Sequence, residues 1–395
     1  MEKLERYDPR LAPLTRQVEH MENPQTLYYD KARNIRAERV DGALTLYCHK
    51  DLIEINRHPA VLGVGGRGGF FGNDNPLIPI EVDGDDHKKW RKLLDPLFAP
   101  KQVQQFETSI RTLSRDLIGK FLPTGTAELH DDLCVPLPCL TFLRIIGAPA
   151  EDLPYFLTFK DVVLHPKGDT IEEIGAEMAS AGAKFVEYMK NLIERRRAET
   201  EPADDVLAVL LRSTVDGRPV SDAEVHNIMY LLMFAGLDTV TSSLSCILGW
   251  LGEHPAERRR LVQDPSVIPA AIEELMRYES PVPFGVRFAT DEIDLGDGLV
   301  VQNGDAIHTL WAAANVDESE FPDPLVVDFD RGRTNHIAFA SGTHRCLGSH
   351  LARLELRAAV DEFLQLLPEY EVTEPIVYSN TANRVATHVA ITFPA

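Results

Sequence analysis

One cysteine of this chain lies where its sulfur could bind a metal. Cys346 belongs to the run from Phe339 to Gly348, FASGTHRCLG, and apolar residues at helical spacing follow it from Leu347. At a helix start, unpaired backbone N–H groups and the positive end of the helix dipole favour S⁻ over SH, which prepares a thiol to bind iron. Gly342 and Gly348 would let a flat, bulky cofactor approach the backbone, because no side chain intervenes.

Two other interpretations of Cys346 compete with a cofactor ligand. Free cysteine is among the most buried residue types, so a cysteine at a helix start is more often a packed core residue. Zinc bound by His344 and Cys346 is a weaker alternative, because structural zinc needs four ligands and no second Cys or His pair at short spacing accompanies these two. On this helix alone, a structural role is favoured.

The elements that must position these residues are predominantly helical. Apolar residues recur at helical spacing in long segments, and the strand-like pieces between them are short. The sequence therefore predicts a mainly α fold with small β-sheets. The expected helices span about 102–122, 171–197, 222–252, 268–279 and 347–367, and the expected strands span 43–48, 299–302 and 306–310.

Composition excludes several classes of function. The net charge of −21 over 395 residues argues against binding to nucleic acid or to an anionic membrane, since both depend on Lys and Arg. No run resembles a signal peptide or approaches a membrane span of ~20 apolar residues. Five scattered cysteines fit a reducing compartment without disulfides. We expect a cytoplasmic protein with one domain over 1–395, in which 1–30 is a peripheral segment without a membrane anchor.

A second candidate site lies inside the expected helix 222–252, which Ser221 and Asp222 can cap. Gly236 costs roughly 1 kcal/mol relative to alanine in a helix interior, and Thr239 can divert its hydroxyl to the carbonyl four residues back. The expected result is a local opening of the helix. The commoner explanation is that Gly236 permits close helix packing and that Thr239 is a satisfied core hydroxyl.

Two charged pairs also lie at helical spacing. Glu274 and Arg277 are three residues apart and share one helix face, which alone predicts a solvated ion pair. Glu273 is an alternative acid beside them. His87 and Arg91 are four residues apart and face the same way, and alone they would be ordinary surface charges.

Together these motifs resemble the haem-thiolate monooxygenases, the cytochrome P-450 family. The string Phe-x-x-Gly-x-His-x-Cys-x-Gly is similar to the family's cysteine-ligand loop, with Ala340 where glycine is common, and the resemblance spans roughly 60–390. It implies the cytochrome P-450 fold, a single triangular-prism-like domain with haem b between the central helix and the cysteine-ligand helix. Cys346 would then be the axial ligand of the haem iron.

The resemblance also implies roles for the other motifs. Asp238 would relay protons from solvent and Thr239 would pass them on, so that O–O bond cleavage follows, while the axial thiolate supplies electron density. Glu274 and Arg277 would be the family's buried Glu-x-x-Arg pair, with Arg331 or Arg333 as an undecided third member. Haem propionates need cationic partners, for which the candidates are His87, Arg91, Arg287 and His344. The remaining haem contacts would be Phe339, Gly342, Gly348, Ala235 and Gly236.

A substrate would lie above the haem on the Thr239 side. The segments expected there lean apolar, which predicts a hydrophobic organic substrate and hydroxylation at a C–H bond. Lys160 or Arg384 could hold a substrate carboxylate. The pocket residues that we expect are Phe71, Leu232, Val282 and Phe284.

Electrons must come from a separate protein, because the resemblance includes no reductase domain. Soluble members of the family usually take them from an acidic iron-sulfur ferredoxin and its NAD(P)H-dependent reductase. The docking face would be a basic cluster formed by Lys88, Lys89, Arg91, Lys92 and Lys101 with Arg345, although a solvated helix face explains these residues equally well. The alternatives are a peroxide-driven or non-oxygenating haem-thiolate enzyme and a haem-binding sensor without turnover.

Overall fold

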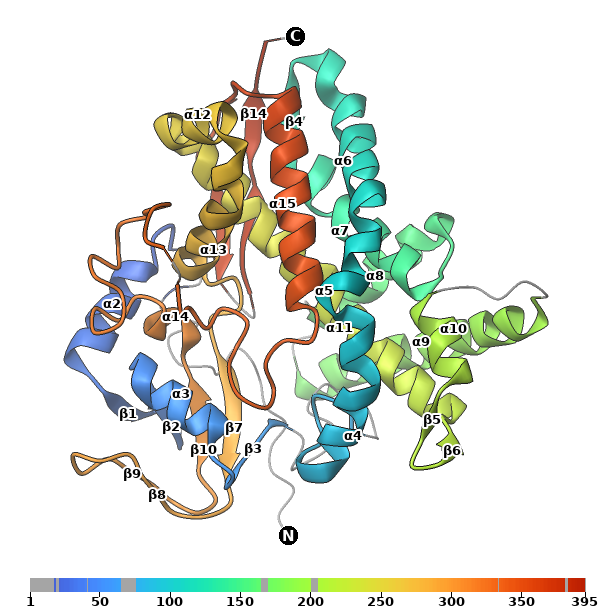
Figure 1. Cartoon of the computed structure of the whole chain (residues 1–395), viewed down its shortest axis with the longest axis vertical. Helices are drawn as coiled ribbons and strands as arrows, with labels where there is room; N and C mark the ends of the chain where they lie inside the picture. Colours follow the sequence, from blue (N-terminus) through green and yellow to red (C-terminus); the bar gives the residue numbers. More distant parts are fainter. Residues whose placement is uncertain are drawn as a thin grey trace. The chain divides into compact units, whose positions relative to one another are not determined.

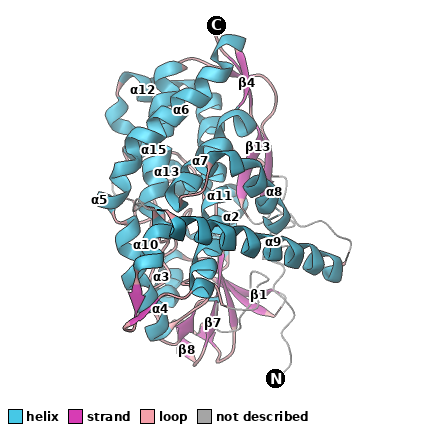
Figure 2. Ribbon diagram, turned by 90° about the vertical axis from the view of Figure 1, so that its right-hand side faces the viewer, coloured by secondary structure: helices cyan, strands magenta, loops and turns pink. Residues whose placement is uncertain are grey.

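The computed structural model describes residues 18, 21–40, 42–64, 76–164, 170–199, 205–332, 334–380 and 383–394. Helices predominate, and the strands form small separate sheets (Figures 1 and 2). The helices are α2 (Gln25–Asn34), α3 (His49–Arg57), α4 (Gly84–Leu94), α5 (Pro100–Val103), α6 (Glu107–Phe121), α7 (Pro136–Ile146), α8 (Leu153–Leu164), α9 (Ile171–Ala198), α10 (Val206–Arg212), α11 (Asp222–Glu253), α12 (Pro255–Gln263), α13 (Ile268–Glu279), α14 (Trp311–Ala314) and α15 (Ser349–Leu366).

The strands pair mostly as antiparallel ribbons. One five-stranded sheet has the order β1-β2-β10-β7-β3, in which β2 and β10 run parallel. The strands are β1 (Ala37–Val40), β2 (Ala43–Leu46), β3 (Val61–Leu62), β4 (Thr126–Glu128), β5 (Thr214–Val215), β6 (Arg218–Pro219), β7 (Gly285–Ala289), β8 (Ile293–Asp294), β9 (Val300–Val301), β10 (Ala306–Thr309), β11 (Glu371–Val372), β12 (Val377–Asn380), β13 (Arg384–His388) and β14 (Ala390–Thr392).

The sequence predicted the long helices closely, with one exception. The expected helices 171–197, 222–252, 268–279 and 347–367 correspond to α9, α11, α13 and α15. The expected helix 102–122 is wrong at its start, because short helical turns occupy 100–106 before α6 begins at Glu107. The three expected strands correspond to β2, β9 and β10.

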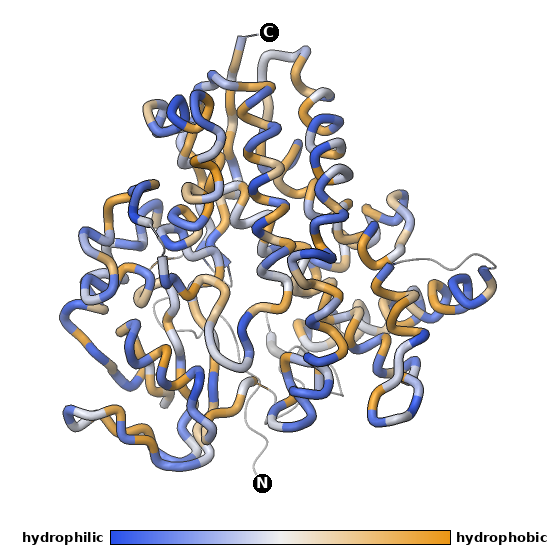
Figure 3. Tube along the Cα trace, viewed as in Figure 1, coloured by the Kyte–Doolittle hydropathy of each residue, from blue (hydrophilic) through white to orange (hydrophobic). Residues whose placement is uncertain are grey.

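Two compact units can be distinguished. Unit 1 contains Met1–Leu62, Val103–Leu137 and Thr239–Ala395, and unit 2 contains Gly63–Gln102 and Pro138–Asp238. In unit 1, α15 packs between α6 and α13, and Figure 3 shows apolar and polar residues alternating along α15 as expected for packing by one face. Leu244, Leu275 and Phe363 lie in the core of this unit with no exposed surface.

Helix α11 begins with a capping box and is unusually apolar. The Ser221 hydroxyl accepts from the Glu224 N–H at 3.3 Å, and the Glu224 carboxylate accepts from the Ser221 N–H at 2.9 Å. This helix is long and apolar enough to cross a membrane, so the expectation that no run approaches a membrane span is wrong. Yet 72% of its most apolar window is buried within the protein, as expected for a core helix.

Candidate functional site

The loop before α15 holds Cys346 by its own backbone. Cys346 lies two residues before Gly348, the N-cap of this 18-residue helix, and its thiol is exposed. The Cys346 N–H donates to the Phe339 carbonyl at 2.9 Å, and the Arg345 N–H donates to the Gly342 carbonyl at 3.2 Å. The prediction of a cysteine just before a helix start is confirmed, whereas the packed-core alternative does not fit an exposed thiol.

Two residues of this loop have left-handed backbone conformations. Ala340 has φ of 55°, where an L-residue pays roughly 1–2 kcal/mol, so its replacement of the more usual glycine carries strain. Gly342 has φ of 71°, and a Cβ on it would lie 1.8 Å from the Asn56 carbonyl oxygen at the end of α3. Gly342 is therefore required first by α3, a reason that differs from the expected approach of a cofactor. A Cβ on Gly348 would meet open space.

Helix α11 carries the second candidate site. Ala235 is exposed although most of the helix is buried. The helix is continuous from Asp222 to Glu253, so the expected local opening is wrong. A Cβ on Gly236 would lie 3.0 Å from the Phe142 ring of α7, which supports close helix packing as the reason for this glycine. The Thr239 carbonyl accepts the Ser243 hydroxyl at 2.7 Å.

Asp238 forms an ion pair that the sequence did not predict. Its side chain is 9% exposed, and its Oδ1 lies 3.4 Å from Nζ of Lys160 on α8. Burial opposes the positive charge of Lys160, but the carboxylates of Asp238 and Asp161 outweigh it and the pKa of Lys160 is raised. Lys160 already pairs with these two acids, a role that differs from the one suggested with a substrate carboxylate. A signal was present, because Lys160 and Asp161 are the charged residues of an otherwise apolar helix.

The expected propionate partners lie on defined elements. His87 is buried and Arg91 is half-buried on α4, where Arg91 pairs with Asp95 at 2.6 Å. Arg287 is buried in β7, donates to the Val286 carbonyl at 2.8 Å and lies over the Trp311 ring. His344 is half-buried in the cysteine loop. Cys346, His344, Phe339 and Arg287 belong to unit 1, whereas His87, Arg91, Ala235 and Asp238 belong to unit 2.

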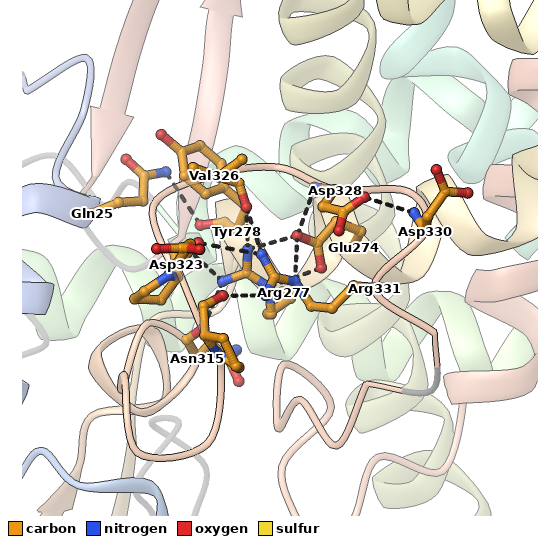
Figure 4. A network of polar contacts seen from close by, with 12 residues as sticks. Gln25, Glu274, Arg277, Tyr278, Asn315, Asp323, Val326, Asp328, Asp330 and Arg331 are labelled. Atoms are coloured by element: carbon orange, nitrogen blue, oxygen red, sulfur yellow. Dashed lines mark hydrogen bonds and ion pairs between the residues drawn. The ribbon is translucent and has the colours of Figure 1, made fainter.

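A buried ionic network joins α13 to the segment before the cysteine loop (Figure 4). Arg277 donates to both oxygens of Glu274, at 2.7 and 2.9 Å, and both side chains are almost fully buried. Arg277 also donates to the Asn315 and Pro324 carbonyls at 2.8 Å. Arg331 donates to Glu274 at 3.0 Å and is therefore a third member, whereas Arg333 lies outside the described residues. The solvated surface pair is excluded.

The structure corrects or limits three further expectations. Arg384 is buried against Glu279 at 2.6 Å, so it is not placed to hold a substrate. In the basic cluster, Lys88 pairs with Asp85 and Lys89 pairs with Asp86. Among the expected pocket residues, Phe71 lies outside the described part of the chain, while Leu232, Val282 and Phe284 are half-buried.

The chemistry of the donor set fits a haem. Among the described residues there is no group of three or more His, Cys, Asp or Glu that could enclose a metal ion. A single thiolate suits a metal that brings its other ligands with it, as the iron of a porphyrin does. The zinc alternative, which needs four protein ligands, finds no support in this part of the chain.

Comparison with known proteins decides the family. The family model for cytochrome P-450 matches residues 159–375. Cytochrome P-450 107B1 of Saccharopolyspora erythraea is 33% identical over 305 residues, which are 77% of this chain and 73% of that protein. This chain belongs to the cytochrome P-450 family. The steroid C26-monooxygenase of Mycolicibacterium smegmatis is 31% identical over 337 residues, covering 85% of this chain and 82% of that protein.

Solved structures give the same fold. The crystal structure of CalO2 superposes with a TM-score of 0.87 at 25% identity, covering 98% of each chain. PksS, a cytochrome P-450 of the bacillaene polyketide synthase of Bacillus subtilis, superposes with a TM-score of 0.86 at 24% identity over 98% of this chain and all of that one. The predicted cytochrome P-450 fold is confirmed. The protein is a cytochrome P-450 monooxygenase, and its cofactor is haem b.

Proposed function

We propose that this cytochrome P-450 activates dioxygen with electrons from a separate ferredoxin and hydroxylates a hydrophobic organic small molecule. The haem, when bound, supplies the redox chemistry of dioxygen cleavage. Cys346 would hold its iron through the thiolate sulfur. The observation that carries this proposal is the exposed Cys346 thiol on a loop fixed by the 2.9 Å bond between its N–H and the Phe339 carbonyl.

The protein's own residues act on protons and position. Asp238 takes protons from solvent at its carboxylate and hands them to the hydroxyl of Thr239, which donates toward dioxygen. The 3.4 Å pair with Lys160 holds the Asp238 carboxylate in place between transfers. In this proposal His87, Arg91, Arg287 and His344 would bind the haem propionates, and Phe339, Gly342, Gly348, Ala235 and Gly236 would contact the macrocycle.

The substrate is a hydrophobic organic molecule that enters on the Thr239 side. Half-buried apolar side chains at Leu232, Val282 and Phe284 support this class of substrate. Two relatives also support a hydrophobic substrate. One curated relative is a steroid C26-monooxygenase, and the structure of CYP109E1 of Bacillus megaterium was solved in complex with corticosterone.

The electron donor is a small acidic iron-sulfur ferredoxin with an NAD(P)H-dependent reductase. Arg345 is exposed beside Cys346 and supports docking near the thiolate. Lys88 and Lys89 contribute less than expected because nearby carboxylates offset their charge. In this proposal the chain is a single cytoplasmic domain over 1–395, with no membrane or nucleic acid as a partner.

The experiment combines a ligand screen with turnover. Hydrophobic compounds, steroids included, are screened for a substrate-induced spin-state shift of the haem. Compounds that shift it are incubated with NAD(P)H, ferredoxin, reductase and heavy-oxygen-labelled O2. We expect a hydroxylated product carrying one labelled oxygen atom. Equal product from peroxide without the donor proteins would favour a peroxygenase, and ligand binding with no product would favour a sensor; either result contradicts the proposal.

A further inference from the structure

Glu273, the alternative acid beside Glu274, has its own partners, one before and one after the cysteine loop in the sequence. Its two oxygens accept from the Arg353 guanidinium of α15 at 2.6 and 2.7 Å. One of them also contacts Nε2 of His336, whose side chain is 2% exposed, at 3.1 Å. Glu273 and Glu274 therefore reach from one turn of α13 to different groups around the same loop.

These partners continue to the backbone of Cys346. The Arg353 guanidinium lies 4.3 Å from the centre of the Phe339 ring. His336 Nδ1 accepts the Ala338 N–H at 3.3 Å, so its Nε2 carries the proton donated to Glu273. Both contacts fix the segment whose Phe339 carbonyl accepts the Cys346 N–H at 2.9 Å. The path from Glu273 to Cys346 consists of direct contacts within unit 1.

Packing and polar contacts both hold this segment. Ala338 lies in the hydrophobic core and Phe339 packs against it, while Glu273, His336, Phe339 and Arg353 also line a cavity of about 1080 Å³. Burial alone would raise the pKa of Glu273, yet hydrogen bonds from His336 and Arg353 lower it to about 2. The carboxylate is thus charged at neutral pH and available to both partners.

We propose that Glu273, Arg353 and His336 form a positioning unit that sets the geometry of the Cys346 thiolate. This inference rests on the proposed function, in which Cys346 is the axial ligand. If the Phe339 carbonyl shifts, the Cys346 N–H loses its acceptor and the backbone that carries the sulfur can move. A sulfur that is held less firmly donates less electron density to the iron, which raises the reduction potential of the iron and favours loss of the thiolate.

The test replaces each member and compares one matched control in the holoenzyme. Arg353→Gln and Glu273→Gln remove the ion pair, and His336→Gln leaves it in place. Arg357→Gln is the control, since Arg357 lies one turn further along α15 and donates to the Arg353 carbonyl at 3.0 Å. The readouts are the reduction potential and the rate at which the ferrous–CO complex loses its red-shifted Soret band.

We expect the three test variants to have a more positive potential and to lose the red-shifted band about 10-fold faster than the control, with Arg353→Lys recovering part of the difference. If Glu273→Gln and Arg353→Gln do not take up haem, the reduction potential and the rate of band loss in His336→Gln decide whether the positioning role holds. A wild-type protein with the red-shifted band and test variants that match Arg357→Gln would overturn the positioning role. A wild-type protein without that band would instead refute the proposed function.

Discussion

Lys160 and Asp238 form a buried ion pair, with Nζ 3.4 Å from Oδ1 and side chains 10% and 9% exposed. The pair joins α8 to the centre of α11, where the Cys139 thiol also reaches the Leu237 carbonyl at 3.8 Å. Asp161 also forms an ion pair with Lys160, with Oδ1 3.4 Å from Nζ, but its side chain is 66% exposed. One lysine thus contacts a buried and a solvated carboxylate, which provides a matched comparison.

Double-mutant cycles should separate these two contacts. Because removing one member of a buried pair leaves the other charge uncompensated, we expect Lys160→Met and Asp238→Asn to be coupled by about 1–3 kcal/mol in the free energy of unfolding. Lys160→Met and Asp161→Asn should be coupled by less than about 1 kcal/mol, since Asp161 is solvated. Urea denaturation measures both, and equal coupling energies would mean that Asp238 is not held by Lys160.

Thr239→Ala should separate electron consumption from product formation. The variant should keep haem and substrate binding, while product per NAD(P)H falls about 10-fold and peroxide rises, because a proton donor is lost. Ser243→Ala is the control, since its hydroxyl donates to the Thr239 carbonyl at 2.7 Å and lies one turn further along α11. Full coupling in Thr239→Ala would remove Thr239 from proton delivery.

Arg277→Ala should prevent stable haem incorporation. The substitution leaves the Glu274 carboxylate buried without its main partner, at a cost of about 3–5 kcal/mol in folding free energy. Arg260→Gln removes a solvated pair with Asp330 and should change stability by less than about 1 kcal/mol. Haem absorbance per protein after purification measures the effect, and normal occupancy in Arg277→Ala would show that this network is dispensable.

The capping box of α11 should contribute stability that depends on pH. Hydrogen bonding by Arg218 is the main reason that the pKa of Glu224 falls from its ordinary value of 4.5 to about 2. A lowered folded-state pKa contributes stability above pH 4.5, and this contribution is lost as pH falls through about 2. Glu224→Gln should therefore cost about 1 kcal/mol at neutral pH, allowing for the half-exposed Arg218, and much less near pH 2.

Thermal unfolding across that pH range measures the effect, with Glu187→Gln as the control because Glu187 is exposed on α9. A destabilisation by Glu224→Gln that stays constant down to pH 2 would show that the carboxylate charge is irrelevant to the cap.

The sequence predicted local features better than distant pairings. Leucine spacing located α15 to within two residues of each end, because helical periodicity is a local property. The partners of Glu274 could not be chosen, since Arg331 reaches it from a loop 57 residues away. Gly342 was explained by a cofactor, yet its nearest constraint is the backbone of Asn56. These pairings depend on how loops fold back onto helices, which no local pattern encodes.

The motif in the cysteine loop was informative for a different reason. Its residues meet through the short-range bond from Cys346 to Phe339, so the spacing in the sequence already reflects the geometry. Lys160 and Asp238 are 78 residues apart in the sequence. Nothing in the sequence indicated that they pair, beyond the presence of charged residues in an otherwise apolar helix.

Thiolate ligation by Cys346 is tested most directly by the absorbance spectrum of the reduced protein with CO. The wild-type protein should show the red-shifted Soret band of a thiolate-ligated haem. Cys346→His should bind haem and lack that band, because imidazole replaces sulfur. The same change at Cys48, the half-buried N-cap of α3, should leave the band in place. A red-shifted band that persists in Cys346→His would contradict the assignment of Cys346 as the axial ligand.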